Sequence, residues 1–142
     1  LYTTAPYNSF DTHAGQMVGH AALWRDVSAA IRDFQTDLTE NAAADNMVLL
    51  VFTEFGRRAH DNGSGTDHGS GGVAFVIGDA VKGGLYGEYP SLEAGKLLEG
   101  DLHYNNDFRS LYSTLLEKWI GIDAKPVVGG TFEQMDFIQA QS

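Results

Sequence analysis

Apolar residues recur at helical spacing along residues 17–40. From Trp24 onward they alternate three and four positions apart, and charged residues fill the opposite face. This pattern predicts a long amphipathic helix whose apolar stripe packs in the core. His20 lies next to the stripe, so we expect a packed or solvent-facing side chain there and not a ligand. The predicted stripe consists of Met17, Trp24, Val27, Ile31, Phe34 and Leu38.

A second helical pattern covers residues 108–120. Asn106-Asp107 provide a cap before its first turn, and Gly121 suits the position just after its last turn, where left-handed backbone is common. Residues 91–98 fit either a short helix or an irregular connection. The predicted buried stripe of this second helix consists of Phe108, Leu111, Tyr112, Leu115, Leu116 and Trp119.

Short apolar runs predict β-strands. Residues 47–52 and 73–77 are each uninterrupted apolar sequence, which is typical of a strand buried on both faces. Residues 1–10 begin with β-favouring side chains and end in turn formers, so they predict a strand and its exit loop. The glycine-rich stretch 56–72 predicts a loop, with a turn signal at Asp61-Asn62-Gly63.

The succession of helix and buried strand predicts an α/β fold, and 142 residues suit one domain. In open α/β sheets, functional sites lie outside the carboxyl ends of the strands. Glu54 and Arg57 directly follow the strand predicted over residues 47–52. We therefore expect the functional site at this end of the sheet.

Composition narrows the range of partners. A formal net charge of −10 would repel nucleic acid, and Arg57-Arg58 is the only adjacent basic pair. Acidity also suits a chain that binds cations, although it can serve solubility alone. The absence of cysteine excludes disulfides, thiolate zinc ligands and cysteine nucleophiles. No apolar run approaches the ~20 residues that span a bilayer, so we expect no membrane span.

Carboxylate and imidazole side chains gather at three places where strand ends are predicted. Oxygen and nitrogen ligands suit a divalent metal, and the histidines favour zinc ahead of manganese, magnesium and calcium. Such a metal would activate a nucleophile or polarise a phosphoryl or sulfuryl oxygen. An alternative stays open at the first motif, because Asp11 or Thr12 can cap the following helix. The predicted metal ligands are Asp11, His13, Glu54, Asp67 and His68.

Arg57 is the predicted substrate-binding residue, because its planar guanidinium can clamp an anionic ester. Its alternative role is a surface ion pair. The glycine-rich stretch lacks the ligand spacing of an EF-hand, the lysine of a phosphate loop and the dinucleotide-binding spacing, so we expect none of these sites. His60 and His103 lie in polar surroundings and have no assigned role.

Five short motifs follow one another between Phe10 and Trp119. They are Phe10-Asp11-Thr12-His13 with Gln16, Thr53-Glu54-Phe55-Gly56-Arg57, Gly65-Thr66-Asp67-His68-Gly69, Val81-Lys82-Gly83-Gly84, and Asp107-Phe108-Arg109 ahead of Leu116-Glu117-Lys118-Trp119. In this order they resemble the motifs of a bacterial family of unknown function in the alkaline phosphatase and sulfatase superfamily. The resemblance covers most of the chain.

This resemblance implies an αβα sandwich with a mostly parallel central sheet, of which this chain is the C-terminal part. It implies hydrolysis of phosphate or sulfate esters and a periplasmic or secreted location. It also implies that one metal takes ligands from Asp11, His13 and His68. The second metal of the superfamily takes an Asp-His pair that corresponds here to Glu54-Phe55, and Phe55 has no ligand atom.

The superfamily nucleophile is expected upstream of this chain. The chain starts at Leu1, and no signal-peptide pattern is visible. We therefore expect a fragment whose open sheet edge is covered by a missing N-terminal half or by another chain.

Three hypotheses about function are compatible with these features. The first is a metal-dependent hydrolase, or half of one, acting on a small anionic phosphate or sulfate ester. The second is a metal-poor, non-catalytic relative that serves as a binding or envelope-associated module, which Phe55 favours. The third is a purely structural part of a larger assembly.

Overall fold

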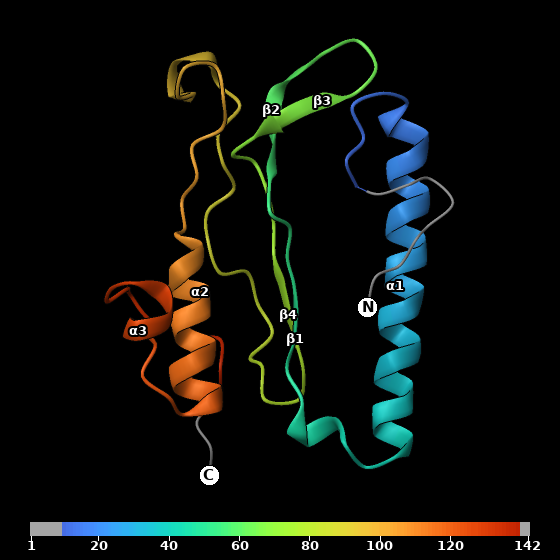
Figure 1. Cartoon of the computed structure of the whole chain (residues 1–142). Helices are drawn as coiled ribbons and strands as arrows, with labels where there is room; N and C mark the ends of the chain where they lie inside the picture. Colours follow the sequence, from blue (N-terminus) through green and yellow to red (C-terminus); the bar gives the residue numbers. More distant parts are fainter. Residues whose placement is uncertain (1–9, 140–142) are drawn as a thin grey trace.

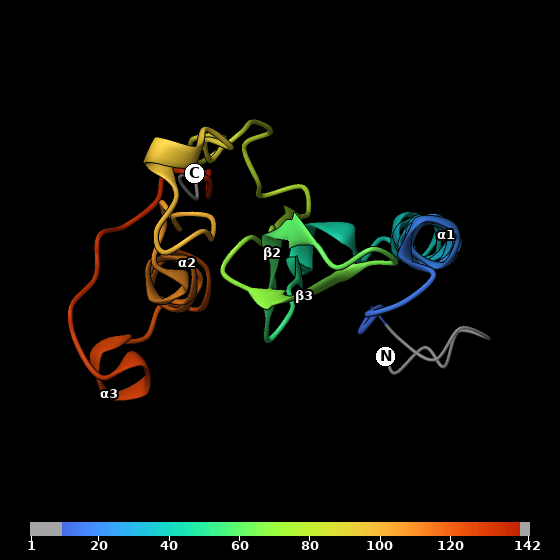
Figure 2. The same ribbon diagram turned by 90° about the horizontal axis from the view of Figure 1, so that it is seen from above.

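A computed structural model describes residues 10–139 and arranges them in three layers (Figures 1 and 2). Helix α1 (Gln16–Glu40) lies on one side of the β-strands, and helices α2 (Phe108–Thr114) and α3 (Lys125–Val128) lie on the other. Short helical turns occur at η1 (Ala44–Asn46) and η2 (Ala94–Lys96). The strand predicted over residues 1–10 falls, except for its last residue, outside the described part of the chain.

The strands form one long, interrupted hairpin. β1 (Leu49–Val51) leads into β2 (Gly56–Asp61), and β3 (Thr66–Gly69) leads back into β4 (Phe75–Ile77). β1 pairs with β4 and β2 with β3, both antiparallel, with Leu50 opposite Val76 and Arg57 opposite His68. Each pair is a separate two-stranded sheet. The chain thus runs out along one arm and returns along the other (Figure 1).

The predicted αβα sandwich with a mostly parallel central sheet is therefore wrong. Parallel neighbours need a crossover connection of a dozen or more residues, usually a helix. Residues 52–74 connect β1 to β4 here, and they form a hairpin that reverses the chain direction. The two apolar strands consequently meet antiparallel. Their side chains are only partly buried or exposed, in contrast to the predicted burial on both faces.

Residues 56–72 were predicted to form a loop, but they contain the strands β2 and β3. The turn predicted within this stretch, at Asp61-Asn62-Gly63, is confirmed. The side-chain oxygen of Asn62 accepts the backbone N–H groups of Ser64 (3.1 Å) and Gly65 (2.8 Å). Gly63 adopts the left-handed region at φ 94°, which glycine tolerates without steric cost. Local side-chain bonding of this kind is what makes Asn a turn former. The turn closes the hairpin next to the Asp61–Thr66 pair, and an irregularity in β2 shifts the register before the Arg57–His68 pair.

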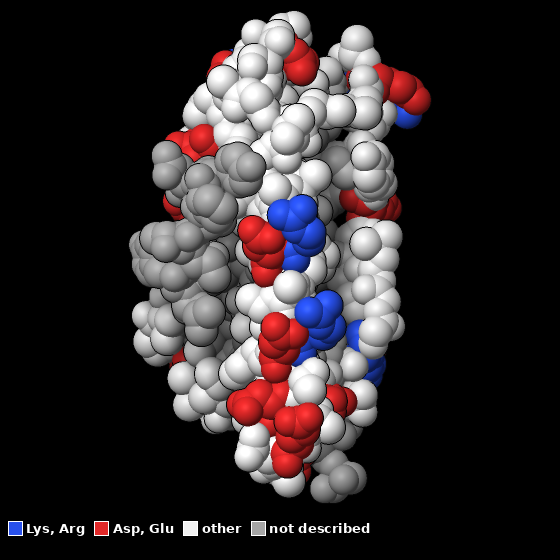
Figure 3. Space-filling view, turned by 90° about the vertical axis from the view of Figure 1, so that its right-hand side faces the viewer, with Lys and Arg blue, Asp and Glu red and all other residues white. Residues whose placement is uncertain are grey.

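Helix α1 has nearly the predicted bounds, but its stripe is only partly confirmed. Trp24 reaches the strands, with its ring centroid 5.6 Å from that of Phe75 on β4. Leu23 is the buried residue of the helix, whereas Met17 and Phe34 of the predicted stripe are exposed. The opposite face carries adjacent pairs of basic and acidic side chains, which Figure 3 shows interspersed on this side of the molecule. The periodic pattern therefore predicted the bounds of the helix more accurately than it predicted which of its side chains are buried.

The second predicted helix consists of α2 followed by a π-helical turn, η3 (Leu115–Ile120). Its predicted cap is confirmed, because the Asp107 carboxylate accepts the backbone N–H of Arg109 at 2.9 Å. The side chain of Arg109 also donates to this carboxylate, and the bond lowers the pKa of Asp107 to about 2. Gly121 ends the helix with φ 78°, as expected for this position. Phe108 of the predicted stripe is exposed.

Apart from Leu23 on α1, the fully buried residues cluster on the α2 side of the molecule. Phe137 and Ile138 follow α3 and pair with the segment around Val81, where Lys82 donates its backbone N–H to the carbonyl of Phe137 at 2.8 Å. Thr114 is fully buried on α2 and accepts the backbone N–H of Met135 at 2.8 Å. Contacts between α2 and the C-terminal segment therefore form the core of the described residues.

The solvent-accessible surface area is large for a chain of this size. The chain exposes 9911 Å², whereas a compact monomer of 15.4 kDa exposes about 7,200 Å². Large apolar side chains contribute to this surface, among them Met17, Leu85 and Tyr89, each more than four-fifths exposed. Within residues 10–139, no helix is both long and apolar enough to cross a membrane.

Candidate metal centre

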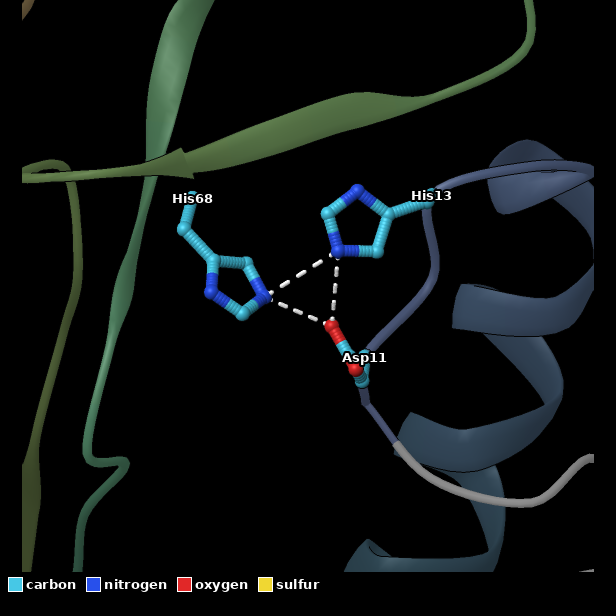
Figure 4. Close-up of side chains that lie close together, drawn as sticks. All are labelled: Asp11, His13 and His68. Carbon is cyan, nitrogen blue, oxygen red and sulfur yellow. Dashed lines mark hydrogen bonds and ion pairs between the residues drawn. The ribbon is translucent and has the colours of Figure 1, made fainter.

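The site forms where the loop preceding α1 meets the β2–β3 hairpin. Asp11 and His13 come from the loop and His68 comes from β3 (Figure 4), where Asp67 directly precedes it. A backbone hydrogen bond joins the two segments at their ends: the N–H of Gln16 donates to the carbonyl oxygen of Ser64 at 3.1 Å. Two segments that lie more than 50 residues apart in sequence are thereby held side by side.

Three potential ligand atoms converge on one point. The carboxylate oxygen of Asp11 lies 2.6 Å from Nε2 of His68 and 3.0 Å from Nε2 of His13, and the two Nε2 atoms are 3.2 Å apart. Figure 4 shows the three side chains facing one another across the gap between loop and strand. Within the described part of the chain, this is the one group of acidic, His or Cys side chains close enough to hold a metal ion together.

The geometry fits a divalent metal such as zinc. Tetrahedral ligands at bonds of about 2.05 Å lie about 3.3 Å from one another, so a small outward shift of the three atoms would accommodate an ion. The three side chains are 45–48% exposed, which leaves their outer side open to solvent. Three protein ligands with one open position are the arrangement of catalytic zinc sites, including sites with two histidines and one carboxylate.

Both carboxylates near this point are held in their ionised form. The hydrogen bond to His68 lowers the pKa of Asp11, and the neighbouring charges of His13, His68 and Arg57 act in the same direction. The hydrogen bond to His13 lowers the pKa of Asp67, and a second bond from Asn62 adds to the effect. Ionised carboxylates are the form that binds cations.

Arg57 connects the loop to the hairpin from beneath the site. Its guanidinium donates to the backbone carbonyls of Thr66 and Phe10, each at 2.5 Å, and lies 3.9 Å from the Asp11 carboxylate. The side chain is only 18% exposed. These bonds fix the backbone immediately before Asp11 and Asp67. The predicted clamp on an anionic ester stays a prediction.

Phe55 contributes to the site although it cannot be a ligand. Its ring stacks on the imidazole of His68, with centroids 3.8 Å apart and planes at 9°. The guanidinium of Arg57 lies 5.2 Å from the centroid of the same ring. Stacking restricts the rotation of His68 and directs its Nε2 towards Asp11. The sequence offered no signal for this role, because an aromatic residue beside a predicted ligand pair has no fixed partner.

The predicted ligands Glu54 and Asp67 lie outside the group of three converging atoms. Glu54 is exposed in the bend between β1 and β2. Asp67 instead contacts Nδ1 on the other side of the His13 ring, at 3.1 Å. Asn62 was interpreted only as a turn residue, yet it also donates to the Asp67 carboxylate at 3.1 Å and to the carbonyl of His13 at 3.2 Å. Its side chain therefore connects turn, loop and site.

Gly65 permits the close approach of loop and hairpin, and its replacement by alanine is expected to open the site. The residue is buried, and an added Cβ would lie 2.8 Å from the carbonyl oxygens of both Thr12 and His13. Overpacking of this kind costs about 1–3 kcal/mol. We expect Gly65→Ala to lower the free energy of unfolding by this amount and to weaken metal binding, measured by urea denaturation and zinc titration.

Gly72→Ala provides the control for this change. An added Cβ there would meet only the Cα of Gly56, at an ordinary 3.6 Å, so its effect should stay within about 0.5 kcal/mol. Equal stabilities of the two variants would show that the loop does not depend on close contact at residue 65.

Comparison with known proteins identifies a family. Residues 2–134 match the family model described as "Protein of unknown function (DUF1501)". Searches of the curated proteins and of the solved structures found no match. The family match covers nearly the whole chain and agrees with the expected resemblance to a family of unknown function. This chain belongs to the DUF1501 family.

Proposed function

We propose that this chain carries the metal centre of a hydrolase that acts on phosphate or sulfate esters. The observation that supports it most directly is the convergence of Asp11, His13 and His68 to within 3.2 Å of one another. Zinc is the preferred ion because two of the three ligands are imidazoles and no thiolate is present.

Residues of this chain would bind the metal ion and hold its ligands in position. Asp11, His13 and His68 would hold the ion, Phe55 would keep His68 oriented, and Arg57 would fix the backbone of the loop. A zinc ion in such a site lowers the pKa of bound water to about 7 and polarises an ester oxygen. The half-exposed rim gives an ester access to the ion from solvent.

Membership of the alkaline phosphatase and sulfatase superfamily is part of this proposal and rests on the motif resemblance. In that case the nucleophile comes from a segment upstream of residue 1, and the ester substrate reaches the metal in the periplasm or outside the cell. The antiparallel strands of the described residues do not supply the parallel sheet of that superfamily.

The non-catalytic hypothesis has one specific observation in its favour. Phe55 occupies the position expected for a second metal's histidine, and its ring is engaged in stacking with His68. A site reduced to one metal is compatible with a binding module as well as with an enzyme. Metal content and turnover must therefore be measured separately.

The test is zinc titration of the full-length protein, followed by assays with p-nitrophenyl phosphate and p-nitrophenyl sulfate. We expect one zinc per chain, anomalous scattering at the point between His13 and His68, and hydrolysis that a chelator removes and zinc restores. Zinc binding without turnover of either ester would favour the binding module. A metal-free protein that does not take up zinc would refute the metal centre.

A further inference from the structure

His13 is contacted by a carboxylate at each end of its ring. Asp67 lies 3.1 Å from Nδ1, and Asp11 lies 3.0 Å from Nε2. A neutral imidazole carries its proton on one nitrogen and leaves a lone pair on the other. If the ring N–H of His13 is on Nδ1 and donates to Asp67, Nε2 keeps a lone pair that can bind a metal. If the N–H is on Nε2 and donates to Asp11, that lone pair is lost.

The distances define a consistent arrangement of hydrogens. His68 Nε2 lies 2.6 Å from the Asp11 oxygen, which makes it the donor to that carboxylate. Nε2 of His13 lies 3.2 Å from the same nitrogen, and it can accept from that N–H only if its own proton is on Nδ1. Nδ1–H of His13 then donates to Asp67. This arrangement satisfies the contacts of His13 with Asp67 and of His68 with Asp11, whereas the 3.0 Å contact between Nε2 of His13 and the Asp11 carboxylate then joins two acceptors.

We propose that Asp67 is a positioning residue that keeps the proton of His13 on Nδ1, and thereby keeps Nε2 available as a metal ligand. Asn62 anchors Asp67 through the 3.1 Å bond to the same carboxylate oxygen. The position of that oxygen, on the far side of the ring from the converging atoms, distinguishes this role from direct ligation.

The turn gives Asp67 the rigidity that the role requires. Asn62 uses its side-chain oxygen for the backbone of Ser64 and Gly65, and its side-chain nitrogen for Asp67 and the His13 carbonyl. One amide group therefore fixes both the carboxylate and the backbone that carries the ring. Carboxylates that bond the second nitrogen of a ligating histidine fix its tautomer and raise its basicity.

The experiment compares Asp67→Ala, Asp67→Asn and a matched control, Asp61→Asn. Asp61 lies on the other arm of the same hairpin, is exposed, and accepts only the backbone N–H of Gly63 among the bonds described for it. Two readouts are taken from each protein at a pH above the ordinary imidazole range. They are the ring-nitrogen chemical shifts of His13 in the zinc-free protein and the dissociation constant for zinc.

We expect His13 to be protonated on Nδ1 in the wild-type protein and in Asp61→Asn. In Asp67→Ala, Asp11 is the remaining carboxylate beside the ring, so the proton should move to Nε2. Loss of such an outer partner weakens metal binding about 10- to 100-fold. Asp67→Asn keeps an acceptor oxygen, so it should restore much of the tautomer and part of the affinity.

Two results would overturn the positioning role. One is a His13 that stays protonated on Nδ1 in Asp67→Ala, and the other is a zinc affinity for that variant within about threefold of the wild type. The affinity measurement rests on the proposed function, whereas the nitrogen shifts do not. Wild-type protein that takes up no zinc, yet shows the expected shifts, would refute the proposed function and support the role of Asp67.

Discussion

His68→Ala is expected to abolish zinc binding and, in the full-length protein, ester hydrolysis. The substitution removes one of the three proposed ligands and the 2.6 Å partner of Asp11. The loss should exceed the 10- to 100-fold that outer partners of a ligand typically cost, because the ligand atom itself disappears. Zinc titration and the p-nitrophenyl ester assays measure both effects.

Stability should change little, because the His68 side chain is 45% exposed. We expect a cost of about 1 kcal/mol or less from the lost stacking on Phe55. A folded variant without zinc would therefore report on the site and not on the fold. Circular dichroism before each titration checks this condition.

His60→Ala is the matched control for this variant. His60 lies on β2 of the same hairpin and is exposed, but it does not belong to the converging group. We expect its zinc affinity and turnover to equal those of the wild type. If His60→Ala and His68→Ala bind zinc with the same affinity, the proposed metal centre is refuted.

Phe137→Ala is expected to cause the largest loss of stability. Phe137 is 2% exposed, and its ring packs edge-on against Tyr86 with centroids 5.9 Å apart. Replacing a buried Phe by Ala costs about 3–5 kcal/mol through lost transfer free energy and the remaining cavity. Because domains are stable by only about 5–15 kcal/mol, the variant should be partly or wholly unfolded at 25 °C.

Urea denaturation followed by tryptophan fluorescence measures this effect. Phe137→Leu keeps most of the volume and should cost under about 1.5 kcal/mol, which keeps the comparison measurable if the alanine variant does not fold. Phe108→Ala is the exposed control, since Phe108 is 65% exposed, and it should cost about 1 kcal/mol or less. Equal costs at residues 137 and 108 would contradict the assigned core.

Local pattern located the helices and three side chains that converge at the candidate metal centre. Asp11-x-His13 and Asp67-His68 were recognised as ligand motifs, and the structure brings Asp11, His13 and His68 together. It could not separate Asp67 from His68, because both side chains contact His13 and only the distances show which ring nitrogen each one faces.

The strand arrangement could not be obtained in the same way. Short apolar runs predicted strands at residues 47–52 and 73–77, but a run of this kind does not state whether its partner is parallel or antiparallel. The hairpin between them decided the direction. Burial was also overestimated for Met17, Phe34 and Phe108, because periodicity specifies a face of a helix and not what covers it.

By itself, the amino-acid sequence determined the two long helical segments, the caps at Asp107 and Gly121, the Asn62 turn and the residue types of the candidate metal centre. These features depend on interactions within a few positions along the chain. Only the tertiary structure decided the antiparallel pairing, the core around Phe137 and the contact of the Asp11 loop with β3. Such contacts join residues tens of positions apart, and their free energies depend on distances that a local pattern does not contain.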